Sequence, residues 1–181
     1  MKAKIRDKYL LYKVRKGDSE AFGKIYNIYV DKIYRFVFLK TSSKEESEDI
    51  TGQTFYKVVE YISDSEKQIE NLQAFLYRVA RNLVADFYKK ANIQTLEMTP
   101  KIEETLPDEQ VIPEKRIDQK LELEKVKLAL KELNDDYKDA IILYYIEELP
   151  VREMAQIMDR TEGAVRVLIH RALEALRDKV Q

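Results

Sequence analysis

The chain has 181 residues, of which 45% are hydrophobic, and its 32 lysines and arginines against 33 aspartates and glutamates give a net charge of −1. This balance excludes a uniformly basic nucleic-acid coat protein, and the absence of cysteine excludes a disulfide framework and a thiolate metal site. Because no run approaches the roughly 20 apolar residues of a membrane span, and the basic start lacks the apolar core of a signal peptide, we expect a cytoplasmic protein without stable membrane insertion.

The N-terminal part of the chain shows helical periodicity in three segments, as its low glycine and proline content favours. Residues 1–16 are basic and predict a short helix, and a second helix follows over residues 20–40. Ser43, with Glu46 three residues later, is the signature of a capping box. It predicts the start of a third helix, which ends near Tyr61.

The most informative helix of the first half is predicted over residues 74–91, after a polar loop over residues 62–73 that is expected to bury little. Its apolar residues recur at helical spacing, with Tyr77 and Tyr88 on the flanks of that face. Bases beside aromatic rings suit a surface that stacks unpaired nucleobases, although a solvated amphipathic helix is slightly favoured by this segment alone. The opposite face carries Arg78, Arg81, Asn82, Lys89 and Lys90.

A change of composition marks a boundary between two domains. Residues 92–114 contain three prolines, no helical periodicity, and six acidic residues against one lysine, a charge of −5. Such a segment is typical of a flexible, self-repelling linker. We therefore expect domains over residues 1–91 and 118–181, joined by an acidic linker over residues 92–117.

The second domain is predicted to contain four helices and to end in a helix-turn-helix. Two helices are expected over residues 118–133 and 137–147, the latter capped by Asn134 or Asp135. Two more helices follow within residues 150–177, joined by a polar turn of Asp159, Arg160 and Thr161, in which Thr161 can cap the last helix. The inward stripe of that last helix is Val165, Leu168, Ile169, Ala172 and Leu176.

The outward face of the last helix offers groups that can contact DNA. In a helix-turn-helix the N-terminal part of the second helix lies in the major groove. Arg166 and Arg171 can offer bidentate donors to guanine or charge to phosphate, and Val167 can contact a thymine methyl group. An ordinary pair of packed helices with solvated charges is the competing interpretation, because many helical hairpins share this spacing.

The residues that catalysis or metal binding would need are missing or scattered. His170 is the only histidine, and no glycine-rich phosphate loop occurs. The acidic pairs Asp135-Asp136 and Glu147-Glu148 are interpreted as solvated helix ends. We therefore expect a protein that is not an enzyme and has no cofactor and no metal site.

Three segments, taken in this order and spacing, resemble the sigma-70 family of RNA polymerase sigma factors, in particular its extracytoplasmic-function (group 4) branch. They are EDITGQTF over residues 48–55, FLYRVARN over residues 75–82, and PVREMAQIMDRTEGAVRVLIHRALEALR over residues 150–177. The chain departs from the family pattern at Gly52 and Gln53, at Asp159 in place of the usual turn glycine, and at Val167-Leu168 in place of a common Ser-Arg pair.

This resemblance implies an all-α fold of two small helical domains, a region 2 domain and a region 4 helix-turn-helix domain, with a flexible acidic linker between them. It implies core polymerase binding through Asp49, Gly52, Gln53 and Phe55. It implies recognition and melting of the promoter minus-10 element through the loop at residues 63–71 and through Asn71, Arg78, Arg81, Asn82 and Lys89. Recognition of the minus-35 element would fall to Arg160, Thr161, Arg166, Val167, His170 and Arg171.

The partners that the family implies are the RNA polymerase core enzyme, promoter DNA and an anti-sigma factor. Two other classes of protein compete with this interpretation. A stand-alone helix-turn-helix regulator would bind operator DNA without polymerase, but the first half of the chain shows no motif for an effector pocket. A helical scaffold would bind neither polymerase nor DNA, and its tyrosines would be simple core and interface residues.

Overall fold

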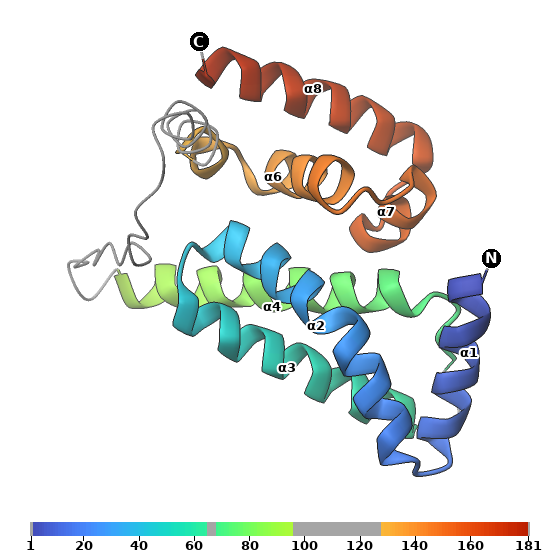
Figure 1. Ribbon diagram of the computed structural model, residues 1–181. Helices are drawn as coiled ribbons and strands as arrows, with labels where there is room; N and C mark the ends of the chain where they lie inside the picture. Colours follow the sequence, from blue (N-terminus) through green and yellow to red (C-terminus); the bar gives the residue numbers. More distant parts are fainter. Residues whose placement is uncertain (1, 65–67, 96–127, 181) are drawn as a thin grey trace, which may run out of the picture.

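The computed structural model describes residues 2–64, 68–95 and 128–180, and over these residues the protein is all-α. Two layers of helices lie one on the other (Figure 1). The first domain consists of α1 (Lys2–Arg15), α2 (Ser19–Thr41), α3 (Lys44–Ser63) and α4 (Leu72–Thr95). The second contains a helical segment at residues 128–132, then α6 (Asp135–Ile141), the π-helix η2 (Ile142–Ile146), α7 (Val151–Met158) and α8 (Glu162–Val180).

Local capping explains where several of these helices begin. The side chain of Ser43 accepts a hydrogen bond from the Glu46 N–H at 3.3 Å at the start of α3, as its sequence signature predicts. Asn134, one of the two predicted caps, accepts from the Tyr137 N–H at 2.9 Å and starts α6. Each cap pairs a backbone donor that helix geometry leaves without an intrahelical partner.

The first domain is built around α2, whose apolar face packs against α3 and α4. Phe36 is fully buried there and meets the ring of Tyr77 edge to face, with ring centroids 5.4 Å apart. Tyr77 is thus a core residue, and its predicted place on a flank of the helix was wrong. Its hydroxyl donates to Glu147 of the second domain at 2.7 Å, which pairs the buried polar group.

The segment between α3 and α4 is shorter and more buried than predicted. The α3 helix continues to Ser63, and α4 begins at Leu72 rather than near residue 74. Ile69 and Leu72 belong to the hydrophobic core, so the expectation that this loop buries little was wrong. At its other end α4 continues to Thr95, beyond the predicted helix end at residue 91. Most of the predicted linker, and residues 118–127 of the predicted next helix, lie outside the described residues.

In the second domain the predicted helix over residues 137–147 is present, but its geometry changes halfway. It begins as α6 and widens into η2, where the Glu147 N–H donates to the Ile142 carbonyl at 2.9 Å, an i to i+5 bond. Glu148 then adopts a positive φ of 51°, which turns the chain toward α7. None of the helices in the described ranges is long and apolar enough to cross a bilayer.

Candidate nucleic-acid and polymerase interfaces

The helix-turn-helix forms as the sequence predicts, with a left-handed residue at its turn. Asp159 ends α7 with φ 53° and ψ 51°, a conformation that Asp tolerates better than most residues. The Thr161 hydroxyl oxygen accepts from the Ala164 N–H at 3.2 Å, so Thr161 caps the helix that follows, as predicted. The inward residues Val165, Leu168, Ile169 and Ala172 are buried, which fixes the opposite face of α8 toward solvent.

Substitution of Asp159 tests the left-handed turn. We expect Asp159→Val to lower the free energy of unfolding by about 1–2 kcal/mol, because the β-branched side chain of Val crowds the backbone in this left-handed conformation more than the side chain of Asp does. Asp159→Gly should change it by less than about 1 kcal/mol. Urea denaturation followed by circular dichroism measures both. Arg152→Val, at an exposed position of α7, is the control; an equal loss there would attribute the effect to side-chain type rather than to the turn.

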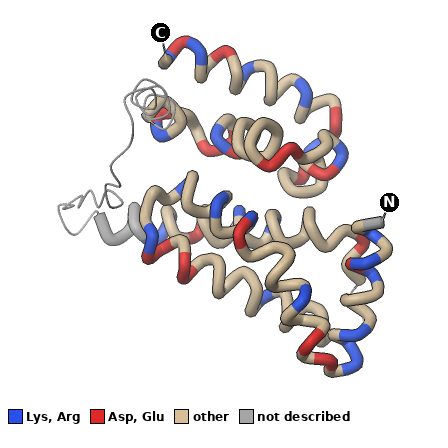
Figure 2. Tube along the Cα trace, viewed as in Figure 1, with Lys and Arg blue, Asp and Glu red and all other residues tan. Residues whose placement is uncertain are grey.

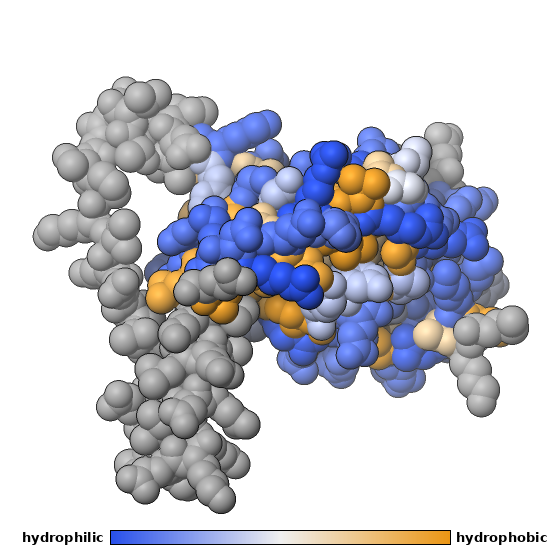
Figure 3. All heavy atoms as spheres, turned by 90° about the horizontal axis from the view of Figure 1, so that it is seen from above, coloured by the Kyte–Doolittle hydropathy of each residue, from blue (hydrophilic) through white to orange (hydrophobic). Residues whose placement is uncertain are grey.

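The predicted minus-35 residues of α8 all lie at the surface. Arg166, Val167, His170 and Arg171 are exposed, and Arg166 forms an exposed ion pair with Glu162 at 3.0 Å. Seen from the side of α8, the surface is largely hydrophilic, with apolar groups between the charged ones (Figure 3). Nothing in the described residues therefore has to move before these four side chains can meet a DNA groove. Their contact with DNA stays a prediction.

Arg160 is placed differently from the other predicted minus-35 residues. Its Nη2 donates to Asp136 Oδ2 at 2.5 Å, and its side chain is 40% exposed. The pair ties the turn of the helix-turn-helix to the start of α6, within the same domain. Arg160 therefore has a structural partner in addition to any contact with DNA.

The predicted minus-10 residues divide into two groups. Arg78, Asn82 and Lys89 are exposed on α4. Arg81 is not: it donates to Asp139 at 2.6 Å and to Asp136 at 3.0 Å, both in the second domain. Burial opposes its charge, but these carboxylates outweigh that effect and raise its pKa, so the guanidinium remains charged. Its expected position on the solvated face was wrong.

Asn71 has two partners in the structure. Its side-chain oxygen accepts from the Ala74 N–H at 3.2 Å and so caps the first turn of α4. Its amide group donates to Gln156 of α7 at 3.4 Å. A part in minus-10 recognition stays a prediction, with a capping role beside it.

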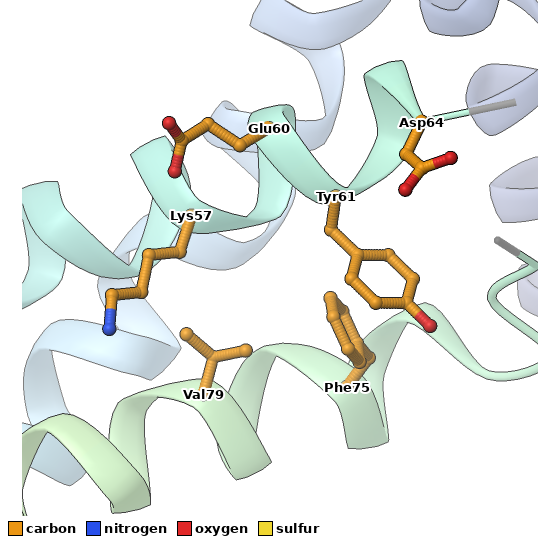
Figure 4. Close-up of a pocket in the computed structure, with 6 residues that line it drawn as sticks. All are labelled: Lys57, Glu60, Tyr61, Asp64, Phe75 and Val79. Atoms are coloured by element: carbon orange, nitrogen blue, oxygen red, sulfur yellow. The ribbon is translucent and has the colours of Figure 1, made fainter.

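A pocket that the sequence did not predict lies beside the loop that joins α3 to α4. Its volume is about 390 Å³, and Figure 4 shows Tyr61 from α3 and Phe75 from α4 side by side at one end. Their ring centroids are 4.5 Å apart, and Arg78 lies over the Phe75 ring at 5.3 Å. The sequence clue was an aromatic residue on each side of the loop. The lining residues are Lys57, Glu60, Tyr61, Asp64, Phe75 and Val79.

The predicted polymerase-binding residues lie on α3. Asp49, Gly52 and Gln53 are exposed, and Gln53 Nε2 donates to Asp49 Oδ2 at 2.6 Å. Phe55, in contrast, is only 3% exposed and packs on Tyr26, with ring centroids 4.8 Å apart. Phe55 therefore packs α3 against the core, and the exposed residues Asp49, Gly52 and Gln53 are the ones that a partner can reach.

Comparison with known proteins places both domains in one family. Family models match residues 25–93 as Sigma-70 region 2 and residues 123–176 as Sigma-70 region 4. The ECF RNA polymerase sigma factor SigW of Bacillus subtilis is 33% identical over 93% of this chain and 93% of its own. The ECF RNA polymerase sigma factor BldN of Streptomyces coelicolor is 30% identical over 92% of this chain, which spans only 63% of the length of BldN.

Solved structures share the arrangement of helices. CnrH in complex with the cytosolic domain of CnrY aligns with a TM-score of 0.71 at 19% identity, over 96% of both chains. The sigma factor RpoE in complex with the anti-sigma factor NepR from Bartonella quintana aligns with a TM-score of 0.65 at 21% identity, over 88% of this chain and 96% of that one. At these identities the likeness shows the fold alone.

Proposed function

The chain belongs to the sigma-70 family of RNA polymerase sigma factors, in its ECF branch, and we propose that its two domains divide promoter recognition between them. The first domain would bind the polymerase core through the exposed residues of α3 and the minus-10 element through α4. The second would read the minus-35 element through α8. The observation that carries this proposal is the outward face of α8, where Arg166, Val167, His170 and Arg171 lie exposed.

Two weak DNA contacts suffice in such an arrangement. Once one domain is bound, the other reaches its element at an effective concentration set by the tether, so modest basicity in each is enough. This agrees with a chain whose net charge is −1. The reaction chemistry would remain with the polymerase, and the protein would work in the cytoplasm, where the chromosome is. By analogy with RpoE and NepR, an anti-sigma factor is the partner that we propose for its control.

The pocket beside Tyr61 supports a mechanism for promoter melting. Flipping a base out of the duplex costs a few kcal/mol, and stacking on an aromatic ring returns about 1–3 kcal/mol per base. Tyr61 and Phe75 line a pocket large enough for a base, and the exposed Arg78, which lies over the Phe75 ring, can neutralise a phosphate beside it. Lys89 is exposed further along α4 and can hold another phosphate. We therefore assign capture of an unpaired minus-10 base to this pocket.

Substitution of Tyr61 tests base capture. We expect Tyr61→Ala to reduce open-complex formation by about 5–30-fold, which corresponds to the loss of roughly 1–2 kcal/mol of stacking. Permanganate footprinting of promoter thymines measures the melted fraction. Tyr61→Phe is the matched control, because it keeps the ring and should melt normally. Unchanged melting by Tyr61→Ala would refute the assignment.

The whole proposal is tested by in vitro transcription with bacterial core polymerase and a pool of genomic promoter fragments. Specific transcripts should start only when the protein is added. An absence of specific transcripts, together with specific binding to duplex DNA by the protein alone, would favour the stand-alone regulator. Binding to neither polymerase nor DNA would favour the scaffold.

A further inference from the structure

The α1 helix presents an apolar stripe to solvent. Ile5, Tyr9 and Tyr12 follow one another at intervals of four and three residues, so they share one side of the helix. Their exposed fractions are 65%, 58% and 61%. We call these three residues the α1 stripe. Both family matches leave it out, since they begin at residues 25 and 123, so neither assigns it a role.

Basic side chains surround the α1 stripe. Residues 2–16 contain seven lysines and arginines, which Figure 2 shows along α1, against the carboxylate of Asp7, a net charge of +6. Lys8 and Lys16 are exposed, and each lies four residues from Tyr12, next to the stripe. This concentration of positive charge on one helix attracts an anionic partner.

The opposite face of α1 anchors it to the first domain. Leu10 and Leu11 are buried and belong to the hydrophobic core. Asp7 is buried as well and accepts a hydrogen bond from the Tyr29 hydroxyl of α2 at 2.5 Å. The core thus fixes which side of α1 faces outward, and that packing does not use the exposed rings. Substitutions in the α1 stripe should therefore leave the fold intact.

The α1 helix lies next to the two helices that form the pocket. It packs against α3 and α4, and Tyr61 of α3 and Phe75 of α4 line the pocket near the ends that the intervening loop joins. Figure 1 shows α1 beside those same ends. A strand that leaves the pocket past the loop therefore reaches α1.

We propose that the α1 stripe binds the unpaired DNA strand where it leaves the pocket. Tyr9 and Tyr12 stack on bases, and Lys8 and Lys16 hold phosphates. This deepens the proposed function and rests on it. Aromatic rings among cations are the usual means by which proteins hold a single strand without reading its sequence. The strand thus gains a contact beyond the captured base, which stabilises the open complex.

The placement of charge on the α1 stripe favours a nucleic acid over an anionic membrane. A helix that lies in a bilayer surface buries an apolar face among the acyl chains. On α1, however, a lysine lies over each tyrosine ring of the stripe, so charge crosses the apolar face. The pairs are Lys13 over Tyr9 at 5.7 Å and Lys16 over Tyr12 at 5.8 Å. Phosphates and bases alternate along a strand as these cations and rings do.

Binding of a single strand by the full-length chain tests the stacking without polymerase. We expect Tyr9→Ala/Tyr12→Ala to bind a random-sequence, single-stranded 20-mer about 10-fold more weakly than the native chain, because both stacking rings are lost. Tyr9→Phe/Tyr12→Phe keeps the rings and should bind normally. Tyr56→Ala, which removes an exposed ring from α3, is the control. Circular dichroism checks that each variant keeps its helices. Unchanged affinity of the alanine variant, or an equal loss in the phenylalanine variant, would overturn the proposal.

The salt dependence of the same binding tests the two lysines. Each phosphate contact to a single strand contributes about 0.7 to the slope of log affinity against log salt concentration, so Lys8→Gln/Lys16→Gln should reduce that slope by about 1.4. The control is Lys24→Gln/Lys32→Gln, which removes the same charge from exposed positions of α2 and should leave the slope unchanged. An equal reduction in both variants would attribute the effect to overall charge and overturn the contact at α1.

Cross-linking tests the path of the strand in the promoter complex. A photoreactive benzoylphenylalanine in place of Tyr12 should cross-link to the melted strand in the open complex with polymerase. Cross-links to polymerase alone would overturn the proposed path. If no open complex forms and no transcripts start, the proposed function fails, whereas the single-strand assay still reports on α1 by itself.

Sedimentation with vesicles of equal parts phosphatidylglycerol and phosphatidylcholine tests the membrane alternative. We expect the native chain and Tyr9→Ala/Tyr12→Ala to sediment equally. Loss of vesicle binding by the alanine variant, with unchanged affinity for the single strand, would show that the α1 stripe is a membrane surface and overturn the proposal.

Discussion

Phe36→Ala is expected to lower the free energy of unfolding by about 3–5 kcal/mol, the usual loss for a buried phenylalanine. The side chain is fully buried at the centre of the first domain, edge to face with Tyr77. Its removal leaves a cavity and also loosens the ring whose hydroxyl reaches Glu147. Urea denaturation followed by circular dichroism measures the change.

The control for Phe36 is Tyr56→Ala, which removes an aromatic ring that is 65% exposed on α3. Surface substitutions of this kind usually change stability by less than about 0.5 kcal/mol. A loss below about 1 kcal/mol for Phe36→Ala would mean that Phe36 is not a central packing residue of the first domain.

Arg166→Ala should weaken binding to a minus-35 duplex by about 5–150-fold, because one bidentate base contact is worth about 1–3 kcal/mol. The measurement is a mobility shift of holoenzyme on a promoter identified by transcription. The fold should be unaffected, since Arg166 is exposed and its ion pair with Glu162 is exposed too. Arg177→Ala removes the same charge from the last turn of α8 and serves as control.

Binding to the polymerase core distinguishes a role of Arg166 in DNA contact from a general effect of the substitution on the protein. A pull-down with core enzyme should recover Arg166→Ala and the native chain equally, because the proposed polymerase surface lies on α3. If association and duplex binding fell together, the assignment of Arg166 to the minus-35 element would be wrong.

Local sequence signals predicted the helices and the helix-turn-helix because their physical causes are local. Ser43, Asn134 and Thr161 each cap a helix through a backbone N–H three residues on. The spacing of Val165 and Leu168 orients α8 in the same way, since apolar residues at helical intervals must share the face that is buried. Such causes can be read from a window of a few residues.

Partners distant in the sequence explain what the sequence did not predict. Arg81 and Asp139 are 58 residues apart, and Arg35 and Glu147 are 112 apart, so no periodicity connects them. From its neighbours in the sequence, Glu147 was predicted to be a solvated helix end, and Tyr77 was predicted to lie on the flank of the apolar face of its helix. Both are buried because the second domain covers the first. The pocket was missed for a similar reason, since Tyr61 and Phe75 come together only when α3 and α4 pack.

The π-helix η2 determines how the residues that follow it are rotated about the helix axis. Each residue advances an ordinary helix by about 100°, so loss of one residue from η2 would turn Glu147 about that far from Arg35 and Tyr77. The helix-turn-helix would be re-aimed by the same rotation. One surplus residue in a single turn thus keeps the interdomain contact and the outward face of α8 in register with each other.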